Sequence, residues 1–132
     1  MEQMPLGTHI VLEFYGCNPE TLKHPDSVQR AFHEAARLAR CTIVTEEYHH
    51  FQPHGVSGVT VIQESHFSAH TWPEHSYAAI DVFYCGEKPE IELGIAHLIE
   101  AFKPKFVERH TMNRGNMPTI SAYSPETAEI GG

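Results

Sequence analysis

Side chains that can attack, donate or accept protons are concentrated between residues 55 and 86 of this 132-residue chain. That segment holds four serines, three histidines, one cysteine and the chain's only tryptophan. Serine and cysteine act as nucleophiles when a base lies beside them, and histidine is the base best matched to neutral pH. The reactive candidates are Ser57, Glu64, Ser65, His66, Ser68, His70, Glu74, His75, Asp81 and Cys85. Their concentration between two apolar runs predicts a catalytic site.

The 11 histidines are many for a chain of this length and raise the question of a bound metal. The spacing H-x-x-x-H-x-x-x-x-H at residues 66–75 matches no standard zinc motif, and His49-His50 with His54 does no better. We therefore predict no metal site. A histidine-rich metal-binding module stays open as an alternative, which the metal content of the purified protein would test.

Charge and apolar content limit the class of partner. Nine Lys and Arg stand against 17 Asp and Glu, and no basic stripe is present, so we expect no nucleic acid partner. The longest apolar runs fall far short of the roughly 20 residues that a membrane span needs. The first residues lack a basic region followed by a long apolar core, and the three cysteines form no C-x-x-C pair. These features predict a cytoplasmic protein in a reducing compartment.

The length predicts a single domain over residues 1–132. Alternating or β-rich runs predict five strands and helical spacing predicts two helices. The strands are expected at 8–15, 42–48, 57–63, 77–85 and 105–112, and the helices at 27–40 and 91–102. The polar remainder, rich in Gly and Pro, predicts a mobile tail at 114–132.

This order, β-α-β-β-β-α-β, has short links in its middle, which indicates antiparallel strands. Two amphipathic helices can cover one face of such a sheet. We therefore predict an α/β fold, a two-layer sandwich with a mainly antiparallel sheet and two helices on one face. The other face carries enough apolar side chains to favour a homodimer.

Several motifs together resemble one known family. The most specific is E-S-H-x-x-x-H-T-W-P-E at residues 64–74, followed by D-x-F-x-C-G at 81–86. G-V-S-G-V at 55–59 and T-H-I-V-L-E-F-Y-G-C at 8–17 add to it. Together they resemble the bacterial and archaeal type of S-adenosylmethionine decarboxylase, a small pyruvoyl-dependent family that supplies aminopropyl groups for polyamines such as spermidine. The resemblance runs from about residue 8 to residue 114.

The resemblance implies an inactive proenzyme that cuts itself between Glu64 and Ser65. Ser65 would attack the carbonyl group of Glu64 to give an ester, with Ser57 as a candidate donor to the oxyanion. His70 matches the processing base, which removes the Cα proton of residue 65. The product would be a pyruvoyl group at the start of the 65–132 fragment, and this is the implied cofactor.

The resemblance also assigns roles in turnover. A pyruvoyl ketone accepts the electrons that are released as carbon dioxide leaves the substrate. Cys85 matches the family's proton donor, and Phe51, Trp72 and Glu74 match positions that border its substrate site. The family builds its sites between two protomers, which implies a homodimer here.

Two alternatives to this function follow from the same residues. His75-Ser76 and the histidine-rich run 48–54 depart from the family pattern near the substrate pocket. A pyruvoyl-dependent decarboxylase of a basic amino acid, ornithine or arginine, is therefore the second reading. An unprocessed regulatory paralogue would be expected to lack Ser65, His70 or Cys85, and all three are present.

Overall fold

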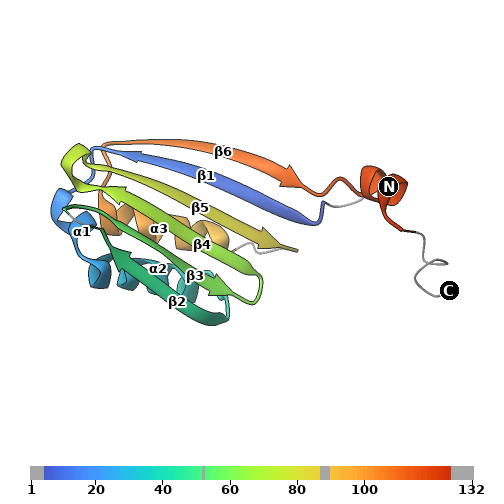
Figure 1. The fold of residues 1–132 in the computed structure, drawn as a ribbon, viewed down its shortest axis with the longest axis horizontal. Coiled ribbons are helices and arrows are strands. Elements are labelled where there is room, and N and C mark those ends of the chain that lie inside the picture. The colour runs from blue at the N-terminus through green and yellow to red at the C-terminus, as the bar shows by residue number, and fades with distance from the viewer. Residues whose placement is uncertain (1–4, 52, 87–89, 126–132) are drawn as a thin grey trace.

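Six strands form one antiparallel sheet in the computed structural model of the chain, which describes residues 5–51, 53–86 and 90–125. The strands lie in the order β2-β3-β4-β5-β1-β6 (Figure 1). Their bounds are β1 (Gly7–Tyr15), β2 (Ile43–His50), β3 (Val56–Ile62), β4 (Ser65–Trp72), β5 (Tyr77–Cys85) and β6 (Phe106–Arg114). The predicted antiparallel α/β sandwich is confirmed.

One strand was not predicted. The segment after residue 63 forms β4, which is joined to β3 by a two-residue turn made of Gln63 and Glu64, since Ile62 pairs with Ser65. The sequence prediction missed this hairpin because neither turn residue is the Gly, Asn or Pro that usually marks a tight turn. Strand β4 ends at Trp72, and a short 3-10 turn, η1 (Pro73–His75), follows it directly.

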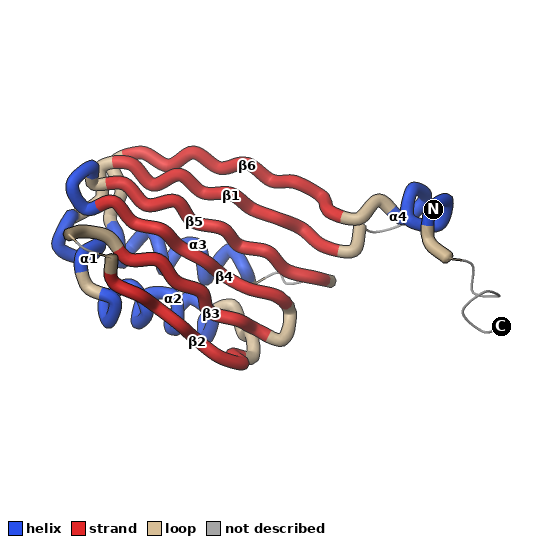
Figure 2. The backbone as a smooth tube through the Cα atoms, in the orientation of Figure 1, coloured by secondary structure: helices blue, strands red, loops and turns tan. Residues whose placement is uncertain are grey.

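Two long helices cover one face of the sheet, as predicted (Figure 2). They are α2 (Pro25–Leu38) and α3 (Ile91–Phe102), and a short helix, α1 (Pro19–Lys23), precedes α2. Helix α2 buries Val28, Phe32 and Ala35, whose spacing forms one apolar stripe. Helix α3 ends at Lys103 in a left-handed conformation before Pro104, which cannot continue a helix.

The hydrophobic core lies between the helices and the sheet. Alternate strand residues point into it, as the period of a β-strand requires. Its largest fully buried side chains are Phe14, Phe32, Phe67, Phe102, Ile10, Leu12, Leu22, Ile80, Ile91, Leu98, Val28 and Val56. The remaining strand residues point to the opposite face, which we call the open face. Figures 1 and 2 show the sheet from this side, with α2 and α3 behind it.

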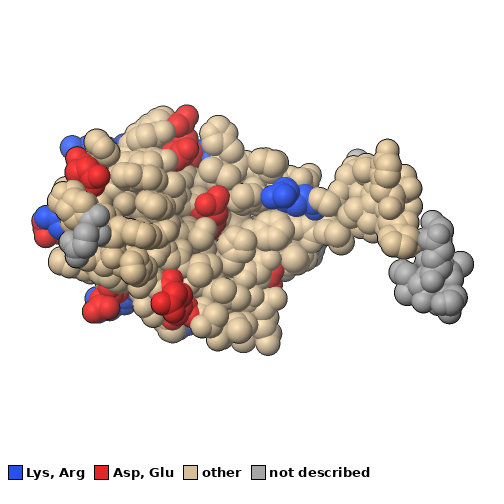
Figure 3. All heavy atoms as spheres, in the orientation of Figure 1, with Lys and Arg blue, Asp and Glu red and all other residues tan. Residues whose placement is uncertain are grey.

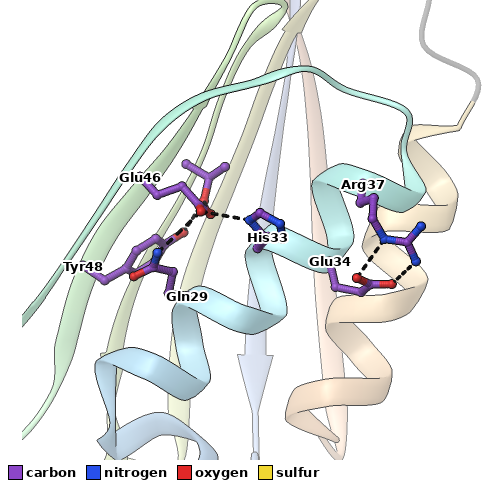
Figure 4. Close-up of polar contacts among 7 residues, drawn as sticks. Gln29, His33, Glu34, Arg37, Glu46 and Tyr48 are labelled. Carbon is purple, nitrogen blue, oxygen red and sulfur yellow. Dashed lines mark hydrogen bonds and ion pairs between the residues drawn. The ribbon is translucent and has the colours of Figure 1, made fainter.

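A polar network ties α2 to the edge of the sheet (Figure 4). Glu46 of β2 accepts from the hydroxyl of Thr60 at 2.9 Å and lies 2.9 Å from Nδ1 of His33. The hydroxyl groups of Thr60 and Tyr48 lie 2.8 Å apart. Burial raises the pKa of Tyr48, so this phenol stays neutral and can donate. The network fixes the position of β2, whose last residue leads into Phe51.

The segment predicted as a tail contains a further helix, α4 (Met117–Tyr123). Its first turn is capped by the side chain of Asn116, which accepts from the backbone N–H of Thr119 at 2.9 Å. The helix buries no side chain and lies beyond the end of the sheet (Figure 1). Residues 126–132 of the predicted tail lie outside the described residues.

Candidate active site

The predicted cleavage site lies in the tight turn between β3 and β4. Two backbone contacts hold this turn against its neighbours: the N–H of Gln63 donates to the carbonyl oxygen of Thr42 at 2.9 Å, and the N–H of Cys85 donates to that of Glu64 at 3.0 Å. The second contact matters for chemistry, because the carbonyl oxygen of Glu64 would carry the negative charge after attack by Ser65. A backbone donor therefore already lies where an oxyanion would form.

Side chains from two strands meet at this turn. The Oγ of Ser65 at the start of β4 lies 3.9 Å from the Sγ of Cys85 at the end of β5. The carboxylate of Glu64 accepts from the backbone N–H of Thr42 at 3.3 Å. Cys85 is exposed, so its thiol is open to a reactant. We call Glu64, Ser65 and Cys85 the nucleophile cluster.

A second group of predicted residues lies at the other end of β3 and β4. Ser57 and His70 face each other across the two strands, and Ser57 Oγ lies 3.3 Å from His70 Nδ1. The imidazole stacks on Trp72 with ring centroids 4.2 Å apart and on Phe51 with centroids 6.0 Å apart. We call Ser57, His70, Phe51 and Trp72 the histidine cluster.

The two clusters are not brought together within one chain. Ser65 and His70 are separated by five residues of an uninterrupted strand, which amounts to about 16 Å at the usual rise. A base must lie within about 3 Å of the proton that it removes. Within a single copy, therefore, neither Ser57 nor His70 reaches Ser65. The structure instead places Ser57 against His70, while the donor on the Glu64 carbonyl is the N–H of Cys85.

The histidine cluster continues as a row of stacked rings across the open face. Tyr77 stacks on Trp72 at 5.2 Å and on Tyr15 at 5.3 Å, and Tyr15 stacks on Phe106 at 6.0 Å. The Tyr77 hydroxyl donates to Glu13, and burial with this carboxylate raises the pKa of Tyr77. These residues were not among the predicted site residues, although alternation along each strand could have placed them on the face of Trp72. Glu74 lies in η1 next to this row and is exposed.

Polar side chains that were not assigned a role lie between the two clusters. His9 Nε2 is 2.9 Å from one carboxylate oxygen of Asp81, and Ser68 Oγ donates to the other at 3.4 Å. Ser68 of β4 and Asp81 of β5 are paired directly across the two strands. His9 of β1 is paired with Phe83, two residues along β5 from Asp81. Figure 3 shows that most of the open face carries neither Lys and Arg nor Asp and Glu.

Within the described part of the chain, no group of three or more His, Cys, Asp and Glu residues could hold a metal ion. Among the same residues, no helix has the length and apolar character to cross a membrane. Of the three cysteines, Cys17 is buried, Cys41 is partly buried and Cys85 is exposed.

Comparisons with known proteins agree on one family. A family model described as S-adenosylmethionine decarboxylase matches residues 8–115. The chain is 49% identical over 121 residues to the S-adenosylmethionine decarboxylase proenzyme of Acidithiobacillus ferrooxidans, covering 92% of this chain and 91% of that protein. It is 43% identical over 127 residues to the proenzyme of the same name from Thermotoga maritima, covering 95% and 98%.

A solved structure shares the fold. The crystal structure of the adenosylmethionine decarboxylase from Aquifex aeolicus matches with a TM-score of 0.80 and 32% sequence identity. The match covers 86% of this chain and 93% of that chain.

Proposed function

Because the chain belongs to the S-adenosylmethionine decarboxylase family, we propose that it decarboxylates S-adenosylmethionine, with a pyruvoyl group made from its own Ser65, in sites that two copies share. It is thus a carbon–carbon lyase. The observation that carries the proposal is the division of the predicted site into two clusters at opposite ends of β4. A single copy holds both halves of the machinery, but not within reach of each other.

A twofold dimer through the open face reunites the clusters. In such a dimer both copies use the same surface. If residue i of one copy contacts residue j of the other, then residue j of the first copy also contacts residue i of the second. An axis that passes near Ser68, in the middle of β4, would place the nucleophile cluster of one copy opposite the histidine cluster of the other. Two sheets commonly pack face to face in this way. The open face suits that packing because it carries a row of aromatic rings and is largely uncharged (Figure 3).

The first step of maturation is assigned to the nucleophile cluster. The Oγ of Ser65 attacks the carbonyl carbon of Glu64, and the C–N bond between the two residues breaks as an ester bond forms. The hydroxyl proton passes to the released nitrogen. The N–H of Cys85, already 3.0 Å from the Glu64 carbonyl oxygen, stabilises the charge that develops there.

The second step is assigned to the histidine cluster of the other copy. His70 removes the Cα proton of residue 65, the bond between Cβ and Oγ breaks, and Glu64 leaves as a carboxylate. Water then replaces the nitrogen of residue 65, which departs as ammonia. For Nε2 to act as the base, Nδ1 must carry the hydrogen and donate it to Ser57 Oγ at 3.3 Å, so Ser57 selects the tautomer.

The residues around position 65 fit a pyruvoyl group. When formed, this group supplies a ketone that condenses with the substrate's amine and accepts the electrons released with carbon dioxide. The Cys85 thiol, whose Sγ lies 3.9 Å from Ser65 Oγ, stands beside that position and can return a proton to the substrate carbon.

Recognition of the substrate falls to Phe51, Trp72 and Glu74. The two rings offer faces for an adenine and for the positive sulfonium of S-adenosylmethionine. Glu74 is exposed and can accept from ribose hydroxyls. The product keeps an aminopropyl group, which places the reaction in polyamine synthesis, with spermidine as the expected end product. The odd number of cysteines and the sequence's lack of a C-x-x-C pair favour a reducing, cytoplasmic setting.

Mass spectrometry and a decarboxylation assay test the proposal together. We expect the purified protein to separate under denaturing conditions into 1–64 and 65–132, the second starting with a pyruvoyl group. We expect it to release carbon dioxide from S-adenosylmethionine and not from ornithine or arginine. A chain that stays intact, or cleaved protein that acts only on a basic amino acid, would refute the proposal.

A further inference from the structure

The imidazole of His70 is fixed by more than its hydrogen bond to Ser57. A contact at Nδ1 alone leaves a ring free to tilt about the axis through that atom. Here the ring also lies nearly parallel to Phe51, with an interplanar angle of 11°, and to Trp72, with an angle of 27°. Three contacts therefore set the plane of the imidazole and the direction of its other nitrogen.

We propose that Phe51 and Trp72 are positioning residues for His70 during self-cleavage, in addition to bordering the substrate site. This role rests on the proposed function. It assigns the rings a task in maturation, which takes place before any substrate binds.

The position of each ring in the fold supports this role. Trp72 is two residues beyond His70 on β4, so both side chains point to the open face. Phe51 follows the end of β2, and its N–H donates to the carbonyl oxygen of Gly55 at 2.9 Å, which closes the loop over the start of β3. The backbone therefore presents the two rings to the imidazole from two different segments.

The consequence is a separation between two kinds of defect. If the rings only bind S-adenosylmethionine, their loss leaves cleavage unchanged, because cleavage uses no substrate. If they position His70, their loss slows elimination while Ser65 can still form the ester. Stacked aromatic pairs contribute enough that losing one ring is expected to slow cleavage by about 2- to 10-fold.

The test compares full-length precursors made by cell-free synthesis and followed on denaturing gels. The variants are Phe51→Leu, Trp72→Leu, the ring-retaining Phe51→Tyr and Trp72→Phe, and the control Phe106→Leu. Phe106 is matched to Phe51 because it is an exposed phenylalanine at the far end of the same row of rings and does not contact His70. Phe51 is 45% exposed, so Phe51→Leu is expected to fold normally.

Hydroxylamine identifies which step is slowed, since it cuts an ester and leaves an amide intact. We expect Phe51→Leu and Trp72→Leu to cleave slowly and to yield fragments with hydroxylamine, while the ring-retaining variants and Phe106→Leu cleave at nearly the wild-type rate. Wild-type cleavage rates in both leucine variants would overturn the role, as would slow cleavage without a hydroxylamine-sensitive ester. A wild-type chain that never cleaves would instead refute the proposed function, and this role with it.

Discussion

Two inactive variants are expected to restore cleavage when they share a dimer. Ser65→Ala removes the nucleophile but keeps the histidine cluster, and His70→Ala does the reverse. About 16 Å of strand separates Ser65 from His70 in one copy, so a chain cannot repair itself. In a mixed dimer, one of the two shared sites joins the intact Ser65 of one chain to the intact His70 of the other.

The yield follows from the symmetry. If equal amounts of the two variants assort at random, about half of the dimers are mixed, and each has one complete site. Only the His70→Ala chain carries Ser65, so about a quarter of all chains are expected to be cut, and none of the Ser65→Ala chains. A site contained in one chain predicts no cleavage at all.

The assay coexpresses the variants with tags of different length and quantifies fragments on a denaturing gel. Copurification of the two tags shows that mixed dimers have formed. The control replaces the Ser65→Ala chain with the double variant Ser65→Ala/His70→Ala, which offers no complete site. Mixed dimers that remain uncut would refute the shared-site arrangement, and so would cleavage of the His70→Ala chain on its own.

Three further results are expected. Cys85→Ala keeps the backbone N–H on the Glu64 carbonyl oxygen, so cleavage persists, while decarboxylation falls by about 10²- to 10⁴-fold with loss of the proton donor; unchanged turnover would contradict this role. Thr71→Val leaves the Val56 N–H and the Leu22 carbonyl without their buried hydroxyl partner. This change should lower the unfolding free energy measured in urea by about 1–3 kcal/mol. The control Thr71→Ser keeps the hydroxyl and should lose less. Burial raises the pKa of the Cys17 thiol to about 11. The unfolded thiol ionises at lower pH than the folded one, so Cys17 should lower the unfolding free energy by about 1 kcal/mol per pH unit as pH rises from about 9 to 11. The fall should therefore be less steep in Cys17→Ala, and an equally steep fall in that variant would contradict the reasoning.

The helices were predictable because their signal is local. Val28, Phe32 and Ala35 recur at a helical period, and Pro104 marks where α3 cannot continue. Each of these patterns lies within one short stretch of sequence, so it can be recognised without knowing the rest of the fold. The hairpin at Gln63-Glu64 carries no comparable signal, so β4 appeared only in the structure.

The arrangement of the site was harder to predict. Ser65 and His70 are close in sequence, and closeness in sequence suggests closeness in space. That holds within a helix or a turn, but a strand separates residues by more than 3 Å for each position. The motif could supply the types and roles of the residues through its resemblance to a family, whereas the distance between them depended on the unpredicted strand.

Cutting the turn between β3 and β4 changes how the protein can be assembled. The first fragment would contribute β1, β2 and β3, and the second β4, β5 and β6. Because β1 lies between β5 and β6, the two fragments would be interleaved in one sheet and would stay bound after the chain was cut (Figure 1). The precursor folds as one chain, but the mature protein would have to reassemble from two. Refolding of the mature protein would then depend on its concentration. After denaturation, the cleaved protein would therefore refold less completely than the uncleaved precursor.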